Sequence, residues 1–254
     1  MSLFSCKNIS KSYGGEHILN GISLKLEPEE FVSLVGASGV GKTTLFNILA
    51  GVEKADAGRV FLNESDITGV CGHVSYMPQN DLLFEHLTVL DNITLPLIIQ
   101  KKKRKEAREY ALSFFSRFGL EDCARKYPAQ LSGGMRQRAA FLRACMLEKP
   151  VMLLDEPFSA LDFITRAEIR EWFAEISRSL HLTTLCVTHD IDEALILSKR
   201  IYVMKGRPAR IGGCYLADGQ QSGSSALTPS RLRLKQQLFS ALSGALIITQ
   251  PKAV

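Results

Sequence analysis

The chain has 254 residues, of which 46% are apolar and 8% aromatic, so its composition excludes a disordered protein and allows a full core. Its 31 Lys and Arg residues against 26 Asp and Glu give a net charge of +5, which suits nucleic acid, an anionic membrane surface or polyphosphate ligands. The six cysteines form no CxxC pair, which argues against a zinc site or a disulfide framework and favours the cytoplasm. The chain contains no apolar run of about 18 residues and no signal-peptide pattern, so we expect it not to cross a membrane by itself.

Short β-rich runs recur along the chain and alternate with segments of helical period. The apolar runs 31–35, 151–154 and 184–187 are typical of strands buried on both faces of a parallel sheet. Apolar residues spaced by three and four predict helices over 105–118 and 169–180. Strands that alternate with helices predict an α/β fold. The other predicted strands are 3–6, 22–26, 59–62, 74–77 and 200–204.

The chain divides into an α/β body with an insertion and a C-terminal extension. Residues 82–148 carry only helical patterns, at 105–118 and 133–147, and predict a helical sub-domain inserted into a body of 1–81 and 149–215. The Gly/Ser-rich stretch 216–227 predicts a linker, and Thr228 and Pro229 predict the start of a helix over 230–242 in a tail of 228–254. The basic run 101–105 is most simply the solvated start of a helix, and a place near lipid headgroups is the alternative.

A glycine-rich loop, GASGVGKTT, lies between the strand 31–35 and an apolar helix that Gly51 ends. Its glycines let backbone amides approach phosphate oxygens. Lys42 can reach the outer phosphates, and the Thr43 hydroxyl can bind Mg²⁺. An ordinary glycine-rich turn is the alternative, but the flanking strand and helix favour a nucleotide site. Its residues are Gly36, Ser38, Gly39, Gly41, Lys42, Thr43 and Thr44.

Polar residues follow three further predicted strands, at the edge of the sheet where ligands bind in open α/β folds. Asp155 and Glu156 follow strand 151–154, where Asp155 would lie near the Mg²⁺ held by Thr43 and Glu156 could polarise an attacking water. An exposed turn has the same pattern when taken alone. His189 follows strand 184–187 and is expected to touch the phosphates, with a structural histidine as the alternative. Gln79 follows strand 74–77 in the same way, although a polar turn residue would also fit.

The stretch LSGGMRQR at 131–138 places two glycines after a serine at the start of a predicted helix. The first amides of a helix have no internal partner and lie at the positive end of its dipole, so this start can bind an anion. It lies about 90 residues after the glycine-rich loop. The chain therefore has a second anion-binding helix start that one nucleotide site does not need.

Together the motifs resemble those of the nucleotide-binding subunits of ABC transporters, over residues 3–205. The resemblance implies a P-loop NTPase core with a mainly parallel sheet, an N-terminal antiparallel β part and an inserted helical sub-domain. It also implies that ATP and Mg²⁺ bind, that ATP hydrolysis drives transport, and that two chains enclose two ATP molecules head to tail. The motifs are 36–44, Gln79, LSGGM at 131–135, LLDEP at 153–157, SALD at 159–162 and His189.

The resemblance implies a role for each matching residue. Tyr13 would stack on adenine, with a core tyrosine at a strand end as the alternative. Ser132, Gly133 and Gly134 would bind the γ-phosphate of ATP held by the opposite chain, and Asp162 would make a contact across the dimer. The implied catalytic residues are Glu156 as general base, His189, Gln79 and Lys42, and the implied Mg²⁺ ligands are Thr43, Gln79 and Asp155.

One departure from the family pattern narrows the resemblance. Met135 stands where many family members have Gln, and LSGGMRQR, DEPFSALD and THDIDEAL look most like importer subunits of the nitrate, sulfonate and taurine type. The sequence runs about fifty residues beyond the last predicted strand, so we expect the long regulatory domain of sugar-importer subunits to be absent. The cargo implied is a small organic or inorganic solute.

The resemblance also implies partners and a location. The apolar segment 82–97 matches the region that receives a coupling helix, so a transmembrane permease would contact Gln79 to Pro96; core packing of the sub-domain is the alternative for about half of its apolar residues. A second ATPase subunit, most simply an identical chain, and an extracytoplasmic solute-binding protein complete the system. The chain would lie on the cytoplasmic face of the inner membrane as a peripheral subunit.

Two other functions compete with this interpretation. A soluble ABC-type ATPase acting on ribosomes or DNA usually has two fused ATPase halves or long coiled coils, and this sequence has neither. No basic surface interleaved with aromatic residues is visible, so we expect no nucleic-acid partner. A P-loop kinase or GTPase would leave LSGG, Gln79 and His189 unexplained, and no NKxD-like guanine motif is present.

Overall fold

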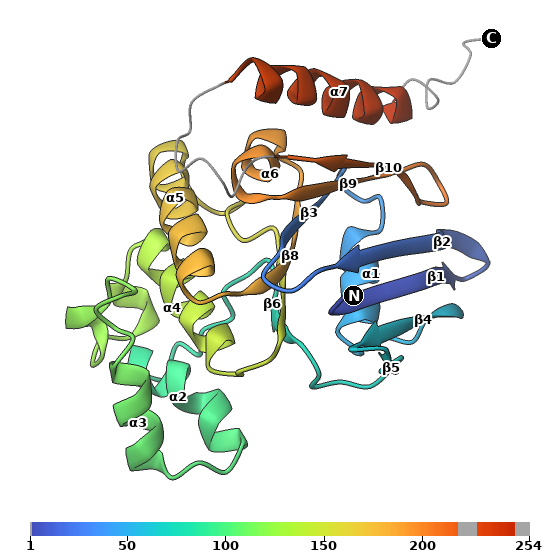
Figure 1. Ribbon diagram of the computed structural model, residues 1–254. Coiled ribbons are helices and arrows are strands. Elements are labelled where there is room, and N and C mark those ends of the chain that lie inside the picture. Colours follow the sequence, from blue (N-terminus) through green and yellow to red (C-terminus); the bar gives the residue numbers. More distant parts are fainter. Residues whose placement is uncertain (1, 218–227, 247–254) are drawn as a thin grey trace.

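The computed structural model describes residues 2–217 and 228–246. Within these ranges six strands form a large sheet in the order β10-β9-β3-β8-β7-β6 (Figure 1). Neighbouring strands are parallel except β10, which is antiparallel to β9. The predicted α/β fold with a mainly parallel sheet is thus confirmed. The strands are β3 Phe31–Gly36, β6 Ser75–Met77, β7 Val151–Asp155, β8 Thr183–Thr188, β9 Arg200–Lys205 and β10 Arg210–Leu216.

A smaller antiparallel sheet comes from the N-terminal part of the chain, as predicted. Its order is β2-β1-β4-β5, with β1 paired to both β2 and β4. The strands are β1 Phe4–Tyr13, β2 Glu16–Leu26, β4 Ala57–Leu62 and β5 Ser65–Asp66. β1 and β2 are longer than the predicted runs 3–6 and 22–26. The predicted runs are too short because polar residues interrupt the apolar pattern in the rest of each strand.

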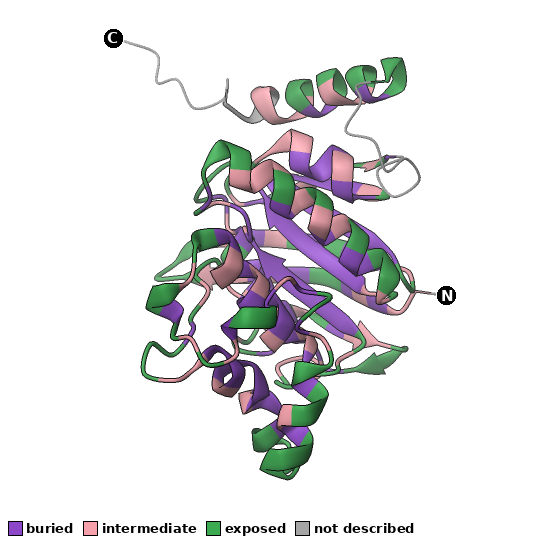
Figure 2. Ribbon diagram, turned by 90° about the vertical axis from the view of Figure 1, so that its left-hand side faces the viewer, coloured by how far each residue is buried: buried purple, intermediate pink, exposed green. Residues whose placement is uncertain are grey.

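Helices cover the two faces of the large sheet differently. They are α1 Lys42–Leu49, α2 Val89–Ile99, α3 Arg104–Leu112, α4 Gly133–Cys145, α5 Phe163–Ser179, α6 Ile191–Leu197, α7 Pro229–Leu246 and the 3₁₀ turns η1 Glu121–Cys123 and η2 Pro128–Gln130. Because side chains alternate along a strand, Val32 and Leu153 join the core around α1, whereas Phe31 and Leu154 join the core around α4 and α5. α1 and α4 therefore pack on opposite faces, and Figure 2 shows the sheet buried between layers with exposed outer turns.

The helical sub-domain lies between β6 and β7, and the described chain from 82 to 148 contains no strand there. Two predicted helices end earlier than expected, and the larger difference is in α3, which ends at Leu112 rather than at 118. From that point the backbone turns tighten: the amide of Phe115 donates to the Leu112 carbonyl three residues before it, and Gly119 has a φ of 61°. α4 likewise ends at Cys145 rather than 147.

The C-terminal helix α7 packs on α6 and β9, and it contains the predicted helix 230–242. Its Leu238 is fully buried, and Lys235 Nζ lies 2.7 Å from Asp192 Oδ1 of α6. β10 extends through Leu216, the first residue of the predicted linker 216–227. Residues 218–227 of that linker and the tail from 247 lie outside the described residues. Among the described helices, none has the length and apolar character needed to span a bilayer.

Candidate nucleotide-binding and catalytic site

Three neighbouring parallel strands bring the predicted phosphate and catalytic residues to one edge of the large sheet. In the register of β3, β8 and β7, Val35 lies opposite Thr188 and Asp155 lies opposite Val187. The glycine-rich loop after β3, the acid pair at the end of β7 and His189 after β8 therefore emerge side by side. This is the edge at which open α/β sheets bind their ligands.

The glycine-rich loop leads into α1 through backbone conformations that favour glycine. Gly41 precedes α1 with a φ of 107°, and a Cβ there would lie 2.9 Å from Cγ2 of Ile18. A Cβ on Gly36 would lie 2.8 Å from the carbonyl oxygen of Met204. No side chain caps the start of α1, so its first amides are available to phosphate oxygens.

Lys42 lies inside the curve of this loop, with only 5% of its side chain exposed. Its Nζ donates to the carbonyl oxygens of Gly36 and Ala37 at 2.9 and 3.0 Å. The same Nζ lies 3.5 Å from Oε1 of Glu156. The loop therefore holds a nearly buried positive charge directly beside the predicted general base.

Glu156 contacts two other predicted site residues, Lys42 and His189. Its Oε2 lies 3.1 Å from Nδ1 of His189, at hydrogen-bond distance. Its backbone has a φ of 45°, a conformation that non-glycine residues seldom adopt, and its amide donates to the Val187 carbonyl of β8. The neighbouring strand thus fixes an unusual turn that directs the carboxylate toward Lys42 and His189.

The structure brings together Asp155 and Thr43, two of the three residues predicted to bind Mg²⁺. The Thr43 hydroxyl donates to Oδ2 of Asp155 at 3.1 Å. Burial raises the pKa of Asp155, while the Thr43 hydroxyl and the charge of Lys42 oppose that rise. A hydroxyl and a carboxylate are hard oxygen donors, and Mg²⁺ is commonly held by one or two such groups together with phosphate oxygens. The donor set fits Mg²⁺, which would share these two side chains with a nucleotide.

Gln79 and Tyr13 lie near the site through contacts that the sequence did not predict. Nε2 of Gln79 lies 3.5 Å from Oγ of Ser159, and Ser159 Oγ donates to the Glu156 carbonyl at 2.9 Å. Tyr13 is 46% exposed and its hydroxyl donates to Glu53, while the nearby Thr44 side chain of the glycine-rich loop opposes the rise that burial causes in the pKa of Tyr13. Its ring is thus beside the loop and open to a ligand.

The second helix start that the sequence predicts to bind an anion belongs to α4, away from the glycine-rich loop and α1 (Figure 1). Ser132 caps α4 by accepting the amide of Met135, and both Ser132 and Gly133 are exposed. Gly134 is buried against α5, where a Cβ would lie 3.0 Å from Cγ2 of Thr165. α1 and α4 pack on opposite faces of the large sheet.

Asp162 of the SALD motif has a role within its own chain. Its carboxylate accepts the amides of Ile164 and Thr165, both at 3.1 Å, and caps α5. Bonds from Thr165 lower its pKa. A contact across a dimer remains a prediction.

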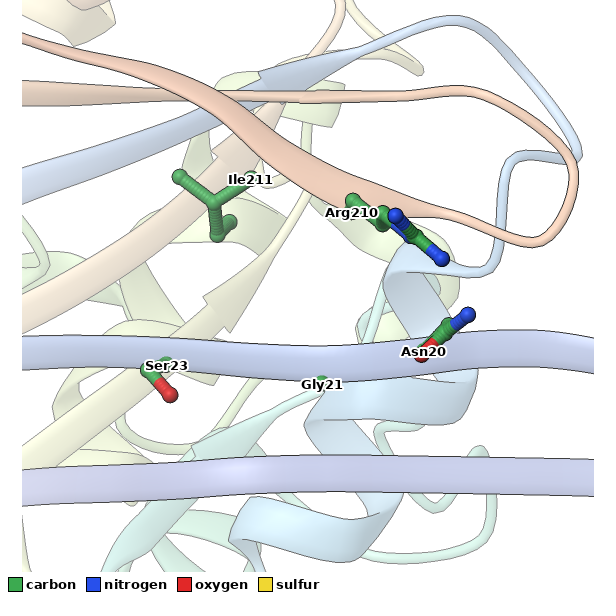
Figure 3. Close-up of a pocket in the computed structure, with 5 residues that line it drawn as sticks. All are labelled: Asn20, Gly21, Ser23, Arg210 and Ile211. Atoms are coloured by element: carbon green, nitrogen blue, oxygen red, sulfur yellow. The ribbon is translucent and has the colours of Figure 1, made fainter.

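A depression elsewhere on the surface lies between β2 and β10 (Figure 3). It is lined by Asn20, Gly21, Ser23, Arg210 and Ile211. None of these residues belongs to the motifs that define the nucleotide site.

Comparison with known proteins identifies the family. The model of the ABC transporter family matches residues 19–159. The chain belongs to the ABC transporter family. It is 41% identical over 207 residues to the formylaminopyrimidine import ATP-binding protein ThiZ of Halalkalibacterium halodurans, covering 81% of either chain. It is also 41% identical to the sulfate/thiosulfate import ATP-binding protein CysA of Nitrosomonas europaea, covering 81% of this chain but only 59% of CysA.

Solved structures of this family have the same fold. The dimeric structure of MJ0796, a bacterial ABC transporter cassette, matches with a TM-score of 0.73 and 30% identity, covering 84% of this chain and 98% of MJ0796. MJ0796 is also known in a dimeric post-hydrolysis state bound to ADP and Pi, with a TM-score of 0.72. The predicted cassette fold and the prediction of an ABC ATPase subunit are therefore confirmed.

Proposed function

We propose that this ABC ATPase powers an importer for a small solute from the cytoplasmic face of the inner membrane, as a peripheral subunit bound to a permease. The observation that carries the proposal is the meeting of Lys42, Glu156 and His189 at the ends of adjacent strands. The import proteins ThiZ and CysA, each 41% identical to this chain, support the direction of transport. That the importer is of the nitrate, sulfonate or taurine type stays a prediction, because ThiZ and CysA are named for other solutes.

Each site residue has its own role in the hydrolysis of ATP. The α1 amides and Lys42 bind the outer phosphates, and Tyr13 stacks on adenine. Glu156 accepts a proton from the attacking water, while His189 orients Glu156 and contacts the γ-phosphate. Gln79 also contacts this attacking water. Thr43, Asp155 and, in the nucleotide-bound state, Gln79 would hold Mg²⁺. The ion would neutralise negative charge on the phosphates.

We further propose that Ser132, Gly133 and Gly134 bind the γ-phosphate of ATP held by a second copy of this chain. Support comes from the exposed α4 start on the sheet face opposite α1. The similar cassette MJ0796 has been solved as a dimer, which supports pairing of two chains. ATP would then hold two chains together, and hydrolysis would release them. A solute-binding protein outside the membrane would complete the importer.

The surface beside Gln79 suits a permease. Leu82 and Phe84 are 59% and 45% exposed, although most of α2 behind them is buried. Buried Asn92 fixes this loop, because its Oδ1 accepts the Phe84 amide at 2.7 Å and its Nδ2 donates to the Leu87 carbonyl at 3.2 Å. A fixed loop that exposes two apolar side chains close to Gln79 could receive a helix of the membrane subunit.

Phe84→Asp is expected to lower the amount of permease that co-purifies with the tagged chain about tenfold, since a charge would enter an apolar contact. Binding of ATP by the isolated subunit should stay unchanged. Phe239→Asp on α7, where Phe239 is 64% exposed, is the matched control. Gentle solubilisation of the native membranes and mass spectrometry provide the measurement. Ribosomes or DNA-binding proteins in place of a polytopic membrane protein would contradict the proposal.

A further inference from the structure

The loop that follows Gln79 is tied to α4 by a two-pronged ion pair. Arg136 donates from Nε to Oδ2 of Asp81 at 2.8 Å and from Nη2 to Oδ1 at 3.3 Å. The same Nη2 donates to Glu85 at 2.8 Å. Burial disfavours ionisation of Asp81, but the bonds from Arg136 and from the Leu83 amide outweigh it and lower the pKa of Asp81. The pair therefore stays charged at neutral pH.

A second arginine of α4 holds the backbone of the same loop. Arg143, about two turns after Arg136, donates from Nη2 to the Asp81 carbonyl at 2.5 Å and from Nη1 to the Leu82 carbonyl at 2.7 Å. Side-chain and backbone atoms of Asp81 are both engaged by α4. The loop consequently has little freedom to move without the helix.

These contacts join two functional positions that belong to different sites. Gln79 precedes Asp81 by two residues, and Arg136 is one turn after Ser132, whose carbonyl accepts the Arg136 amide at 2.9 Å. On the other side, Gln79 reaches Glu156 through Ser159. A continuous series of contacts thus runs from the general base of one nucleotide site to the α4 start that would face another.

We propose that Asp81 and Arg136 are positioning residues that make the loop of Gln79 and the start of α4 move as one body. When Gln79 meets the attacking water in its own site, the Asp81–Arg136 pair carries the displacement of the Gln79 loop to Ser132, which then closes on the nucleotide of the second copy. This inference rests on the proposed function. Its consequence is that nucleotide binding in one site favours closure of the other.

Asp81→Asn and Arg136→Lys test the inference, because each removes part of the two-pronged pair while keeping a similar shape. In a Glu156→Gln background, we expect the ATP concentration for half-maximal dimerisation to rise about tenfold, or about 1.4 kcal/mol. The ATP affinity of the single chain should change less than about twofold. In the Asp81→Asn/Arg136→Lys double variant the two effects should not add, since both changes break one interaction.

Glu148→Gln is the control, because Glu148 pairs with Lys102 at 3.1 Å elsewhere in the sub-domain. Light scattering gives the dimer fraction, titration of the single chain gives ATP affinity, and thermal unfolding shows that each variant is folded. Normal dimerisation of both single variants, or additive effects in the double variant, would overturn the inference alone. An equal loss of single-chain ATP affinity would also overturn it. Failure of the parent Glu156→Gln chain to dimerise would overturn the proposed function as well.

Discussion

Glu156→Gln is expected to lower the turnover of ATP by about 10²- to 10⁴-fold while the chain still binds ATP. The amide keeps the size of the carboxylate but is not a base, so it cannot take a proton from water. Lys42 and His189, at 3.5 and 3.1 Å from the carboxylate, stay in place to bind phosphate. ATP should accumulate uncleaved in a stable dimer.

Single-turnover hydrolysis and dimer mass measure the two halves of this prediction, with Glu148→Gln as a matched control. Hydrolysis above about half of the wild-type rate would show that another group serves as the base. Turnover lost together with ATP binding would instead mean that Glu156 supports the glycine-rich loop. Neither result is compatible with the role proposed for its carboxylate.

Lys42→Ala is expected to weaken ATP binding at least about tenfold, since a charged hydrogen bond contributes about 1.5–3 kcal/mol. Lys42 Nζ is already held by the Gly36 and Ala37 carbonyls, so its charge is fixed where the outer phosphates would lie. Turnover should fall further than affinity, because charge on the transferred phosphoryl group is greatest during reaction.

Titration with a fluorescent ATP analogue measures the affinity of this variant. Lys199→Ala, at an exposed position just before β9, is the control for a lost positive charge. Thermal unfolding in the absence of nucleotide separates loss of binding from loss of fold. Unchanged ATP affinity in a folded Lys42→Ala chain would show that the glycine-rich loop is not the phosphate site.

Much of the body could be predicted because its strands are buried on both faces. The apolar runs 31–35, 151–154 and 184–187 contain only Ser33 and Thr184 as polar residues, and they form β3, β7 and β8. β10 was missed because it is an edge strand in which exposed and partly buried residues alternate, with Gly212 and Gly213 inside it. The predicted helix 105–118 extends beyond the real end of α3 because Phe115 and Phe118 continue the helical spacing. In the structure both side chains are buried, but they belong to turns rather than to the helix.

The catalytic residues could be predicted to meet because each follows a strand of one parallel sheet. That rule brought Lys42, Glu156 and His189 together without knowledge of the packing. It could not place Asp81 opposite Arg136, a pair 55 residues apart whose contact depends on how α4 packs beside the loop. The sequence shows an acid two residues after Gln79 and an arginine in LSGGMRQR. Their opposite charges alone do not show that these two residues pair with each other.

The most direct test of the central claim is whether ATP brings the glycine-rich loop of one chain to the α4 start of another. One Glu156→Gln chain would carry Ser38→Cys and a differently tagged one Ser132→Cys, with the exposed Cys71 and Cys214 replaced by Ser. We expect an ATP-dependent disulfide between the two tagged chains, and none when Ser116→Cys replaces Ser132→Cys. A link within one chain that carries both cysteines, or no link between chains that bind ATP, would contradict the shared sites.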